Sequence, residues 1–358
     1  MNDTVTTSKS EILRSAWRGV QQAKPGIRIR EAAALLGASE AELLATTTGE
    51  EATRLEGDWQ ELLKRLPELG RVMSLTRNDG CILEHKGSFQ KVNTLGVGAR
   101  AMGTVIGPIE TRVFFSAWHS AYAVNQKKND RDLISLQVFD QAGHAITKIY
   151  LQEKSNIKAF EKLVKDFTSA DQGPEQFVKP YAEEKFNEHV SREIFLNDWS
   201  ALKDTHDFYP MLRKHNVHRH QALLLAERKY SHKLHPAAVE KILHEASALK
   251  LPIMIFAGNR GNLQIHQGKI RSVRIIDHGH GGDERWLNIM DPDFNMHLRA
   301  DHIDTVWLVN KPTTDGEVTS VEVFDKNREM VVQFFGLRKP GIPELEEWKK
   351  LASALPRI

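Results

Sequence analysis

The sequence is poor in cysteine. Cys81 is the only cysteine among 358 residues. A single thiol excludes an internal disulfide framework and any zinc or iron–sulfur site built from several thiolates of one chain. We therefore expect the protein to work in a reducing compartment.

Long apolar runs and an excess of one charge are missing as well. No stretch approaches the roughly 18 apolar residues of a membrane-spanning helix, and residues 1–10 lack the basic and apolar regions of a secretion signal. Lysine and arginine number 49 against 47 aspartates and glutamates. This balance does not attract a polyanion, although it allows a local basic pocket. We expect a cytoplasmic protein without membrane insertion.

Several catalytic signatures are also absent. The sequence has no HExxH motif, no nucleotide-binding fingerprint and no serine or cysteine nucleophile elbow. A glycine-rich loop occupies residues 277–283, but residues 284–289 after it resemble a strand, whereas a phosphate cradle needs a helix there. His278 and His280 in this loop either bind a metal or are solvated.

Helical spacing and short alternating runs divide the chain into helices followed by strands. Gly37 is predicted to end one helix, and Ser39 to cap the next with Glu42 three residues on. Helices are expected at 10–23, 28–36, from 39 onward, 58–66 and 156–167. Strands are expected at 72–76, 81–85, 89–95, 103–107, 112–115, 135–139 and 146–151.

The second half of the chain repeats the first. Residues 72–80 are echoed by 253–261, and residues 136–140 by 321–325, at offsets of 181 and 185. A period this long indicates a duplicated domain. We predict an α+β fold of two homologous halves, each a large antiparallel β-sheet with flanking helices. The predicted halves are residues 1–169 and 189–358, joined by a linker at 170–188. We expect a ligand to bind between the halves.

Residues 28–44 have the outline of a helix-turn-helix, which would suggest DNA binding. Against this, residues 38–51 carry acidic side chains at positions 40, 42, 50 and 51 and no basic ones. That charge has the wrong sign for phosphate contacts. We expect a packing unit and no nucleic-acid partner.

His206 is the central candidate for a functional residue. Trp199, Leu202 and Tyr209 lie at helical spacing from it, which places it on an apolar stripe. Pro210 fits the first turn of a helix capped by Thr205 or Asp207. On spacing alone, His206 is either a metal ligand or a hydrogen-bonded core histidine.

The other histidines of this region do not form a clear metal motif. Seven of the 16 histidines lie at positions 206, 215, 218, 220, 232, 235 and 244. His218 and His220 stand at a helix start with their side chains splayed apart, and no paired carboxylates accompany them. We do not expect a structural zinc site.

Cationic and aromatic residues could surround His206. Arg219, Lys311, Arg338 and Arg112 could ring a cleft, with Phe114, Tyr209, Phe256 and Phe335 as its apolar walls. One imidazole for a metal and several cations for carboxylates suit a flat dianionic metal macrocycle. For Arg112 the alternative is an outward-facing side chain on an edge strand.

A family resemblance covers residues 10–355. The segments that carry it are KDTHDF at 203–208, PIMIFAGN at 252–259, WLNIMDPDFNMHL at 286–298, RND at 77–79 with KG at 86–87, and KPTTDGEVTS at 311–320. They resemble the cytoplasmic haem-trafficking and hemin-degrading proteins of Gram-negative haem-uptake systems, the HemS-like family. The resemblance implies iron acquisition, with haem b received from an inner-membrane importer.

The resemblance also assigns residue roles. It implies that His206 is the proximal haem-iron ligand and that Arg112 is the distal arginine. The implied propionate and pocket contacts are Arg219, Lys311, Gln333 and Arg338, and the implied apolar lining is Phe114 and Phe256.

Two functions remain open within the resemblance. The protein either delivers haem, for example to a haem oxygenase, or degrades haem with an external electron donor, because the sequence has no flavin or nicotinamide fingerprint. Asp207 and Tyr209 stand where some relatives carry further histidines, so we do not expect a second histidine to replace His206. The 277–283 loop is longer than the family's usual turn.

Overall fold

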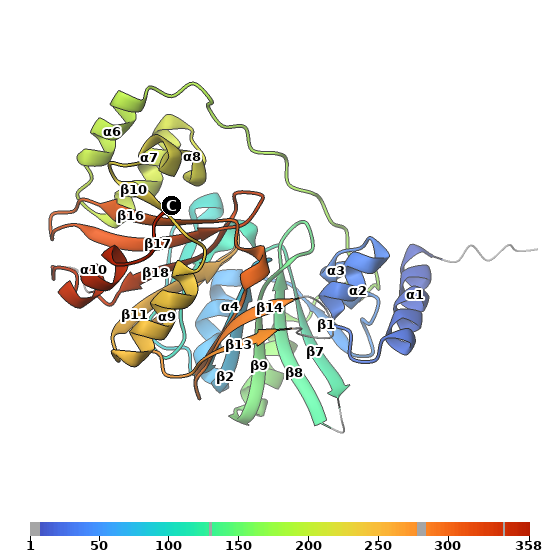
Figure 1. The fold of residues 1–358 in the computed structure, drawn as a ribbon. Coiled ribbons are helices and arrows are strands. Elements are labelled where there is room, and N and C mark those ends of the chain that lie inside the picture. The colour runs from blue at the N-terminus through green and yellow to red at the C-terminus, as the bar shows by residue number, and fades with distance from the viewer. Residues whose placement is uncertain (1–7, 129–130, 278–283, 339–340) are drawn as a thin grey trace, which may run out of the picture. The chain divides into compact units, whose positions relative to one another are not determined.

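The computed structural model describes residues 8–128, 131–277, 284–338 and 341–358 (Figure 1). These form two compact units. The first unit comprises residues 1–76, 85–182 and 259–263, and the second comprises 77–84, 183–258 and 264–358. The boundary after Ala182 falls inside the predicted linker, and the domain limits themselves stay a prediction.

Among its described residues, the first unit contains five α-helices. Its strands form two antiparallel groups. The helices are α1 (Lys9–Ala23), α2 (Ile29–Leu36), α3 (Glu40–Ala45), α4 (Trp59–Arg65) and α5 (Ile157–Phe167). The strands are β1 (Ala52–Leu55), β2 (Gly70–Arg77), β4 (Asn93–Leu95), β5 (Met102–Val105), β6 (Glu110–Phe114), β7 (Ser120–Lys128), β8 (Arg131–Phe139) and β9 (Ala145–Ser155). The two groups are β1-β7-β8-β9-β2 and β4-β5-β6, and the larger is continued by β3 (Cys81–Gly87), which passes from the second unit into the first.

The second unit repeats this arrangement. Its helices are α6 (Arg192–Ser200), α7 (Phe208–His215), α8 (Arg219–Leu225), α9 (Ala238–Ala248) and α10 (Glu346–Ser353). Its strands are β10 (Ser231–Leu234), β11 (Pro252–Gly258), β12 (Asn262–Lys269), β13 (Val273–Asp277), β14 (Arg285–Met290), β15 (Phe294–Arg299), β16 (Thr305–Lys311), β17 (Val318–Phe324) and β18 (Met330–Gly336). The order β10-β16-β17-β18-β11-β12 matches that of the first unit strand for strand. The predicted fold class, two homologous halves with large antiparallel sheets, is confirmed.

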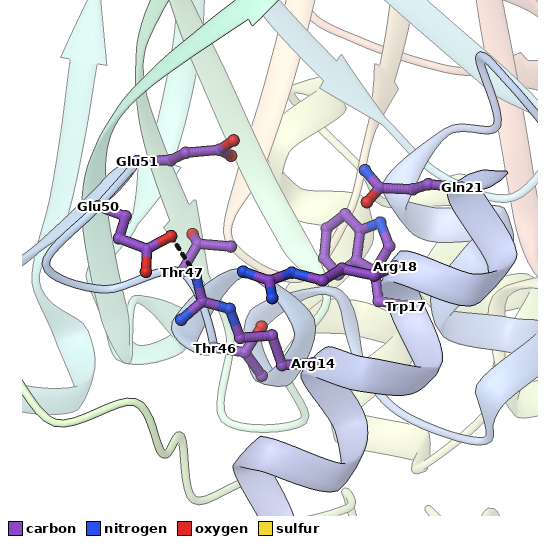
Figure 2. Close-up of a pocket in the computed structure, with 8 residues that line it drawn as sticks. All are labelled: Arg14, Trp17, Arg18, Gln21, Thr46, Thr47, Glu50 and Glu51. Atoms are coloured by element: carbon purple, nitrogen blue, oxygen red, sulfur yellow. Dashed lines mark hydrogen bonds and ion pairs between the residues drawn. The ribbon is translucent and has the colours of Figure 1, made fainter.

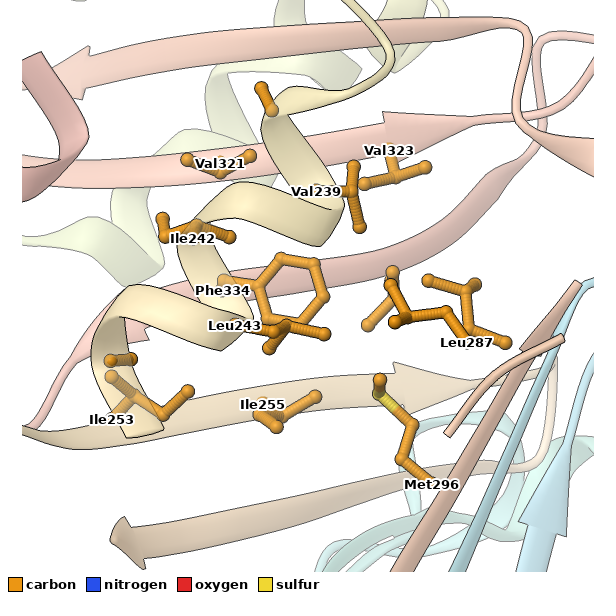
Figure 3. Close-up of a cluster of buried hydrophobic side chains, with 14 of the residues drawn as sticks. Val239, Ile242, Leu243, Ile253, Ile255, Leu287, Met296, Val321, Val323 and Phe334 are labelled. Carbon is orange, nitrogen blue, oxygen red and sulfur yellow. The ribbon is translucent and has the colours of Figure 1, made fainter. Parts of the chain in front are cut away.

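The main core of the second unit lies between its sheet and helix α9 (Figure 3). Val239, Ile242 and Leu243 recur at helical spacing, so they share the face of α9 that packs on the strands. Val321 and Val323 alternate along β17 and meet them from the sheet. Each such buried side chain contributes about 1.5–3 kcal/mol. Alternation turns the residues between them to the opposite face of the sheet.

Local signals place several helix ends where the sequence predicted them. Gly37 ends α2 with a φ of 63°, a left-handed conformation that glycine adopts without strain. The Ser39 side chain accepts from Glu42 N, and the Glu42 side chain accepts from Ser39 N, forming a capping box. The Asn156 side chain caps α5 through a single bond from Ala159 N.

Some strand predictions were wrong. Of residues 89–95, only Asn93–Leu95 form a strand, because Lys91 turns the chain with a φ of 43°. Strands β1 and β7 were not predicted. The β7 sequence SAYAVNQKK consists largely of small and polar residues, which hide the alternation that marks a strand. Among the residues that the structure describes, no helix is both long and apolar enough to cross a membrane.

Two asparagine turns hold corresponding hairpins in place. Asn78 Oδ1 accepts from Gly80 N (3.0 Å) and Cys81 N (2.8 Å), while its Nδ2 donates to Gly258 O (3.1 Å) and Val331 O (2.8 Å). A Cβ on Gly80 would stand 2.8 Å from Val331 Cγ1. The tip of the first half's hairpin is therefore built into the second unit.

The second half's hairpin is built into the first unit by the corresponding contacts. Asn259 Oδ1 accepts from Gly261 N (3.0 Å) and Asn262 N (3.1 Å), and its Nδ2 donates to Ile146 O (2.9 Å). A Cβ on Gly261 would stand 2.6 Å from Ile146 Cδ1. The duplication thus repeats the turn and its acceptor strand together.

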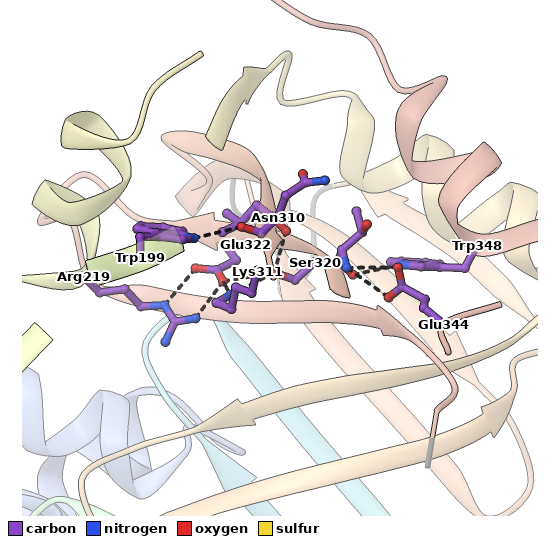
Figure 4. Close-up of polar contacts among 10 residues, drawn as sticks. Trp199, Arg219, Asn310, Lys311, Ser320, Glu322, Glu344 and Trp348 are labelled. Carbon is purple, nitrogen blue, oxygen red and sulfur yellow. Dashed lines mark hydrogen bonds and ion pairs between the residues drawn. The ribbon is translucent and has the colours of Figure 1, made fainter. Parts of the chain in front are cut away.

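A buried carboxyl joins β17 to the segment before α10. Both carboxylate oxygens of Glu344 accept from Thr319 N, at 3.1 and 3.0 Å, and Trp348 Nε1 donates to Thr319 O at 2.9 Å (Figure 4). Burial raises the pKa of Glu344 from 4.5 to about 7, against the opposing effect of the Thr319 hydrogen bonds.

We expect Asn78→Ala to lower the free energy of unfolding by about 2–4 kcal/mol, because it leaves buried donors and acceptors without partners. Urea unfolding followed by circular dichroism measures this change. Asn259→Ala should act similarly, whereas Asn327→Ala at an exposed turn should change it by less than about 0.5 kcal/mol. Equal effects of Asn78→Ala and Asn327→Ala would contradict the role of the turn.

Glu344 should make stability depend on pH. Its carboxyl loses the proton near 4.5 in the unfolded chain but near 7 in the folded protein, so the folded state binds more protons between these values. The contribution of Glu344 to the unfolding free energy should fall by about 2–3 kcal/mol as pH rises from 4.5 to 7. Urea titrations across this range should show that Glu344→Gln removes this part of the slope. An unchanged slope would refute the assignment.

Candidate functional site

His206 lies in a short turn between α6 and α7. The turn, a 3₁₀ helix at Thr205–Asp207, is capped by Asp204, whose Oδ1 accepts from His206 N at 2.8 Å. The Asp207 side chain accepts in return from Asp204 N at 3.0 Å. The helix predicted to run to His215 is α7, and Asp207, one of the two predicted caps, stands at its N-cap position but makes no capping hydrogen bond to it. Residues 201–204, between α6 and the turn, are not helical, and Asp204 is the residue that caps the turn.

The imidazole of His206 is held by one hydrogen bond and is otherwise exposed to solvent. Its Nδ1 lies 2.5 Å from Asp204 Oδ1, and 94% of its side chain is exposed. Among the described residues, Nε2 of His206 has no hydrogen-bond partner. The alternative of a core histidine was wrong, since the side chain is exposed while Trp199 and Leu202 are buried in an apolar cluster that does not include it.

Asp204 is held in its charged form. The hydrogen bond from His206 N lowers the pKa of the Asp204 carboxyl, burial opposes this, and the charges of His206 and Arg338 lower it further. A charged carboxylate on Nδ1 favours the tautomer with its proton on Nδ1, which leaves the lone pair of Nε2 for a metal.

The loop at 312–316 connects the His206 turn to Arg338. Thr314 N donates to Lys203 O at 2.9 Å, one residue before the cap. Asp315 Oδ2 accepts from Gly341 N at 2.9 Å and lies 3.6 Å from an Arg338 guanidinium nitrogen. One loop thereby fixes both the backbone before His206 and a predicted cationic contact.

A buried carboxylate holds two more of the predicted cations (Figure 4). Arg219, the first residue of α8, binds Glu322 through two bonds of 2.8 and 2.7 Å. Lys311 Nζ, at the end of β16, lies 2.9 Å from Glu322 Oε1. Both cations also lie over the Phe208 ring, at 4.9 and 4.7 Å from its centroid. They are thus next to the residue that begins α7.

This cluster carries one net positive charge. Burial raises the pKa of Glu322, but Arg219 and Lys311 outweigh it and hold that pKa well below its usual range. Burial lowers the pKa of Lys311, opposed by Glu322. Because the Lys311 side chain is 3% exposed and that of Arg219 is 25% exposed, an incoming carboxylate would meet Arg219 first.

Beside this cluster, the sheet face carries two phenylalanines and a glutamine. Gln333 stands opposite Glu322 of β17 and opposite Phe256 of β11. Phe256 and Phe335 meet edge to face, with centroids 5.1 Å apart. All three are only partly buried. They form an apolar surface with one amide.

Two donors near this face are unsatisfied. Nε2 of Gln333 and Nε of Arg338 are buried without a hydrogen-bond partner among the described residues. Buried donors normally have partners, so these two suit a ligand that brings acceptor oxygens.

Arg112 and Phe114 lie on β6 in the first unit. Arg112 pairs with Glu110 Oε1 at 3.0 Å and donates to Thr111 O at 3.2 Å. The alternative of an edge strand was wrong, since β6 pairs with β5 on one side and Phe114 N donates to Gly261 O on the other. Because both residues belong to the first unit, their place beside His206 stays a prediction.

The remaining histidines have other surroundings. His218 caps α8 and accepts from His220 N at 3.3 Å. His220 is buried against Trp307 and Phe324. No group of three or more His, Cys, Asp or Glu that could hold a metal occurs in the described part of the chain. His278, His280 and the rest of the 277–283 loop beyond Asp277 lie outside the described residues.

A pocket in the first unit has a different character (Figure 2). It lies between α1 and the turn after α3 and is lined by Arg14, Trp17, Arg18, Gln21, Thr46, Thr47, Glu50 and Glu51. Arg14 pairs with Glu50 across it. Its charges are mixed, and it contains none of the residues predicted for the site.

Sequence reasoning missed three acidic residues of the site. Asp204 could have been found from its capping-box spacing to Asp207. Glu322 carried a weaker signal, a carboxylate inside the apolar run VEVF. Asp315 acts through a contact with Arg338 that no local pattern reveals.

Known proteins share both halves of this chain. Residues 37–167 and 216–355 match the family model of the haemin-degrading HemS.ChuX domain. The hemin transport protein HemS of Yersinia enterocolitica is 30% identical over 342 residues, which cover 94% of this chain and 96% of HemS.

Solved structures are similar over the same extent. Holo-PhuS, a heme-binding protein from Pseudomonas aeruginosa, is 38% identical, with a TM-score of 0.93 over 98% of this chain and 100% of PhuS. ChuS, described as an E. coli heme oxygenase, is 28% identical, with a TM-score of 0.84 over 96% of this chain and 99% of ChuS. Because the family model matches both halves, this chain belongs to the haemin-degrading HemS.ChuX domain family.

Proposed function

We propose that this protein binds haem in the cytoplasm through His206 and passes it on after import. The observation that carries the proposal is the exposed imidazole whose Nδ1 is held by Asp204 and whose Nε2 is open. An isolated imidazole of this kind suits iron that arrives with four ligands of its own. The cargo would be haem b, which supplies the iron and two propionates.

The cations of the second unit support the same ligand. Arg219 offers a partly exposed guanidinium in a cluster with one net positive charge. Arg338 and Gln333 offer buried donors for oxygen atoms, and Phe256 offers an apolar edge. We infer that Arg219 takes the first propionate, while Lys311 supports it through Glu322. Arg112 remains the proposed distal residue, and Phe114 remains a proposed part of the apolar lining.

A second function is haem degradation. It is favoured by the family's description as haemin-degrading and by the similarity to ChuS. Degradation needs electrons from a donor. We propose binding and delivery first, with an importer upstream and either a haem oxygenase or an electron donor as the partner.

We expect hemin to give a saturable one-to-one Soret shift with this protein. His206→Ala should weaken binding at least about tenfold or change the axial ligation, because it removes the iron ligand. His144→Ala is the control, since His144 is an exposed histidine next to an aspartate in the first unit. If His206→Ala and His144→Ala both kept the wild-type spectrum and affinity, His206 would not be the ligand.

The same complex separates carrier from enzyme. Reductant is added in the presence of catalase, and the Soret band is followed. A band that survives supports delivery. Loss of the band with a defined tetrapyrrole product would establish degradation instead.

Arg219 should confer preference for free propionates. Wild-type protein should bind hemin about tenfold or more tightly than hemin dimethyl ester, because a charged hydrogen bond contributes about 1.5–3 kcal/mol. Arg219→Gln should lose this preference, as measured by competitive Soret titration. Arg213→Gln on the exposed side of α7 should retain it. Equal preference in wild type and Arg219→Gln would remove Arg219 from the site.

A further inference from the structure

The hydrogen bonds of Asp204 have a consequence for the iron that His206 would hold. One carboxylate oxygen, Oδ1, accepts both from the backbone nitrogen of His206 at 2.8 Å and from its ring Nδ1 at 2.5 Å. The first bond fixes the residue, and the second fixes the rotation of its ring. Asp204 therefore determines the direction in which Nε2 points.

The backbone that carries this carboxylate is held as well. Asp207 accepts from Asp204 N at 3.0 Å and from Lys203 N at 3.3 Å. Lys203 O in turn accepts from Thr314 N at 2.9 Å. The backbone of the Asp204–His206 pair is thus held by its own capping box and by the 312–316 loop, and the bond from Nδ1 to Asp204 sets the orientation of the ring.

A carboxylate on the outer nitrogen of an imidazole increases the electron donation of the inner nitrogen, because negative charge is drawn into the ring. A stronger donor stabilises ferric iron more than ferrous iron, since the higher charge gains more from it. The midpoint potential of bound haem consequently falls. Oxygen chemistry requires the ferrous form, so a low potential limits which electron donors can start it.

We propose that Asp204 is a positioning residue that makes His206 a strong, imidazolate-like donor and thereby keeps bound haem ferric. This inference rests on the proposed haem binding through His206. It assigns to this site a control over the redox state of the cargo, and it makes delivery of ferric haem the resting behaviour of the protein.

The test uses the haem complex of the full chain and compares Asp204→Asn with wild type. Asparagine has nearly the same shape and keeps an oxygen as acceptor, but it removes the negative charge. Spectroelectrochemical titration should show at least a tenfold higher ferrous-to-ferric ratio at a given potential, which is 59 mV for one electron. The iron–histidine stretching band of the ferrous complex in resonance Raman spectra should shift to lower frequency.

A second aspartate provides the matched control. Asp198 lies 2.6 Å from His215 Nε2, an aspartate–histidine pair in the same helical region that does not include His206. Asp198→Asn should leave the potential and the Raman band unchanged. This control separates a loss of negative charge near α7 from the specific effect on the ligand.

The outcomes distinguish this inference from the proposed function. Unchanged potential and Raman band in Asp204→Asn, with haem still lost in His206→Ala, would overturn the role of Asp204 while leaving haem binding intact. Failure of wild-type protein to bind haem, or an iron–histidine band that persists in His206→Ala, would instead overturn the proposed function. If Asp204→Asn did not fold, Asp204→Ser would replace it, since serine also caps helices but carries no charge, and it should shift the potential and the band in the same directions.

Discussion

The buried carboxylate of Glu322 is the constraint on which the second unit's site depends. It binds Arg219 of α8 and Lys311 of β16 from its position on β17, so three elements meet at one charge. Phe208 lies under both cations, which ties the start of α7 to the same point. Removing one partner from a buried ion pair costs about 3–5 kcal/mol. The position of the His206 turn therefore follows from an interaction that the imidazole does not itself make.

The first unit has the same scaffold but different side chains at the corresponding place. Glu40 begins α3, as Arg219 begins α8, and it pairs with Lys148 of β9 at 3.3 Å. Lys148 stands opposite Gln137 in the register that places Gln333 opposite Glu322. Here the α3 residue is the acid, and the sheet supplies the cation. In the first unit the buried acid and the buried cation therefore neutralise each other and leave no net charge for a ligand.

In the first unit, the segment that follows α5 also bonds to side chains of the sheet. Arg54 Nη1 donates to Gln176 Oε1 at 3.0 Å, and the Tyr122 hydroxyl lies 2.7 Å from the same oxygen. Both side chains thereby bond to the same glutamine of this segment. Duplication thus provided two similar sheets, and the second unit carries both the exposed imidazole of His206 and the partly exposed guanidinium of Arg219.

Much of the fold was predictable because its signals are local. Gly37, Ser39 and Asn156 act within a few residues, and the offset repeat revealed the duplication before any strand order was known. The site was less predictable. The spacing of Trp199, Leu202 and Tyr209 suggested an apolar stripe that includes His206, whereas the ring is exposed on a turn between two helices. Glu322 pairs with residues 103 and 11 positions away, and no periodicity encodes such a distance.

The most direct test of the account is the position of iron in crystals of the haem complex, located by anomalous diffraction. We expect the iron next to Nε2 of His206, with Nδ1 still bonded to Asp204 and a propionate at Arg219. Iron bound at another side chain, with the His206 ring still free, would contradict the central claim.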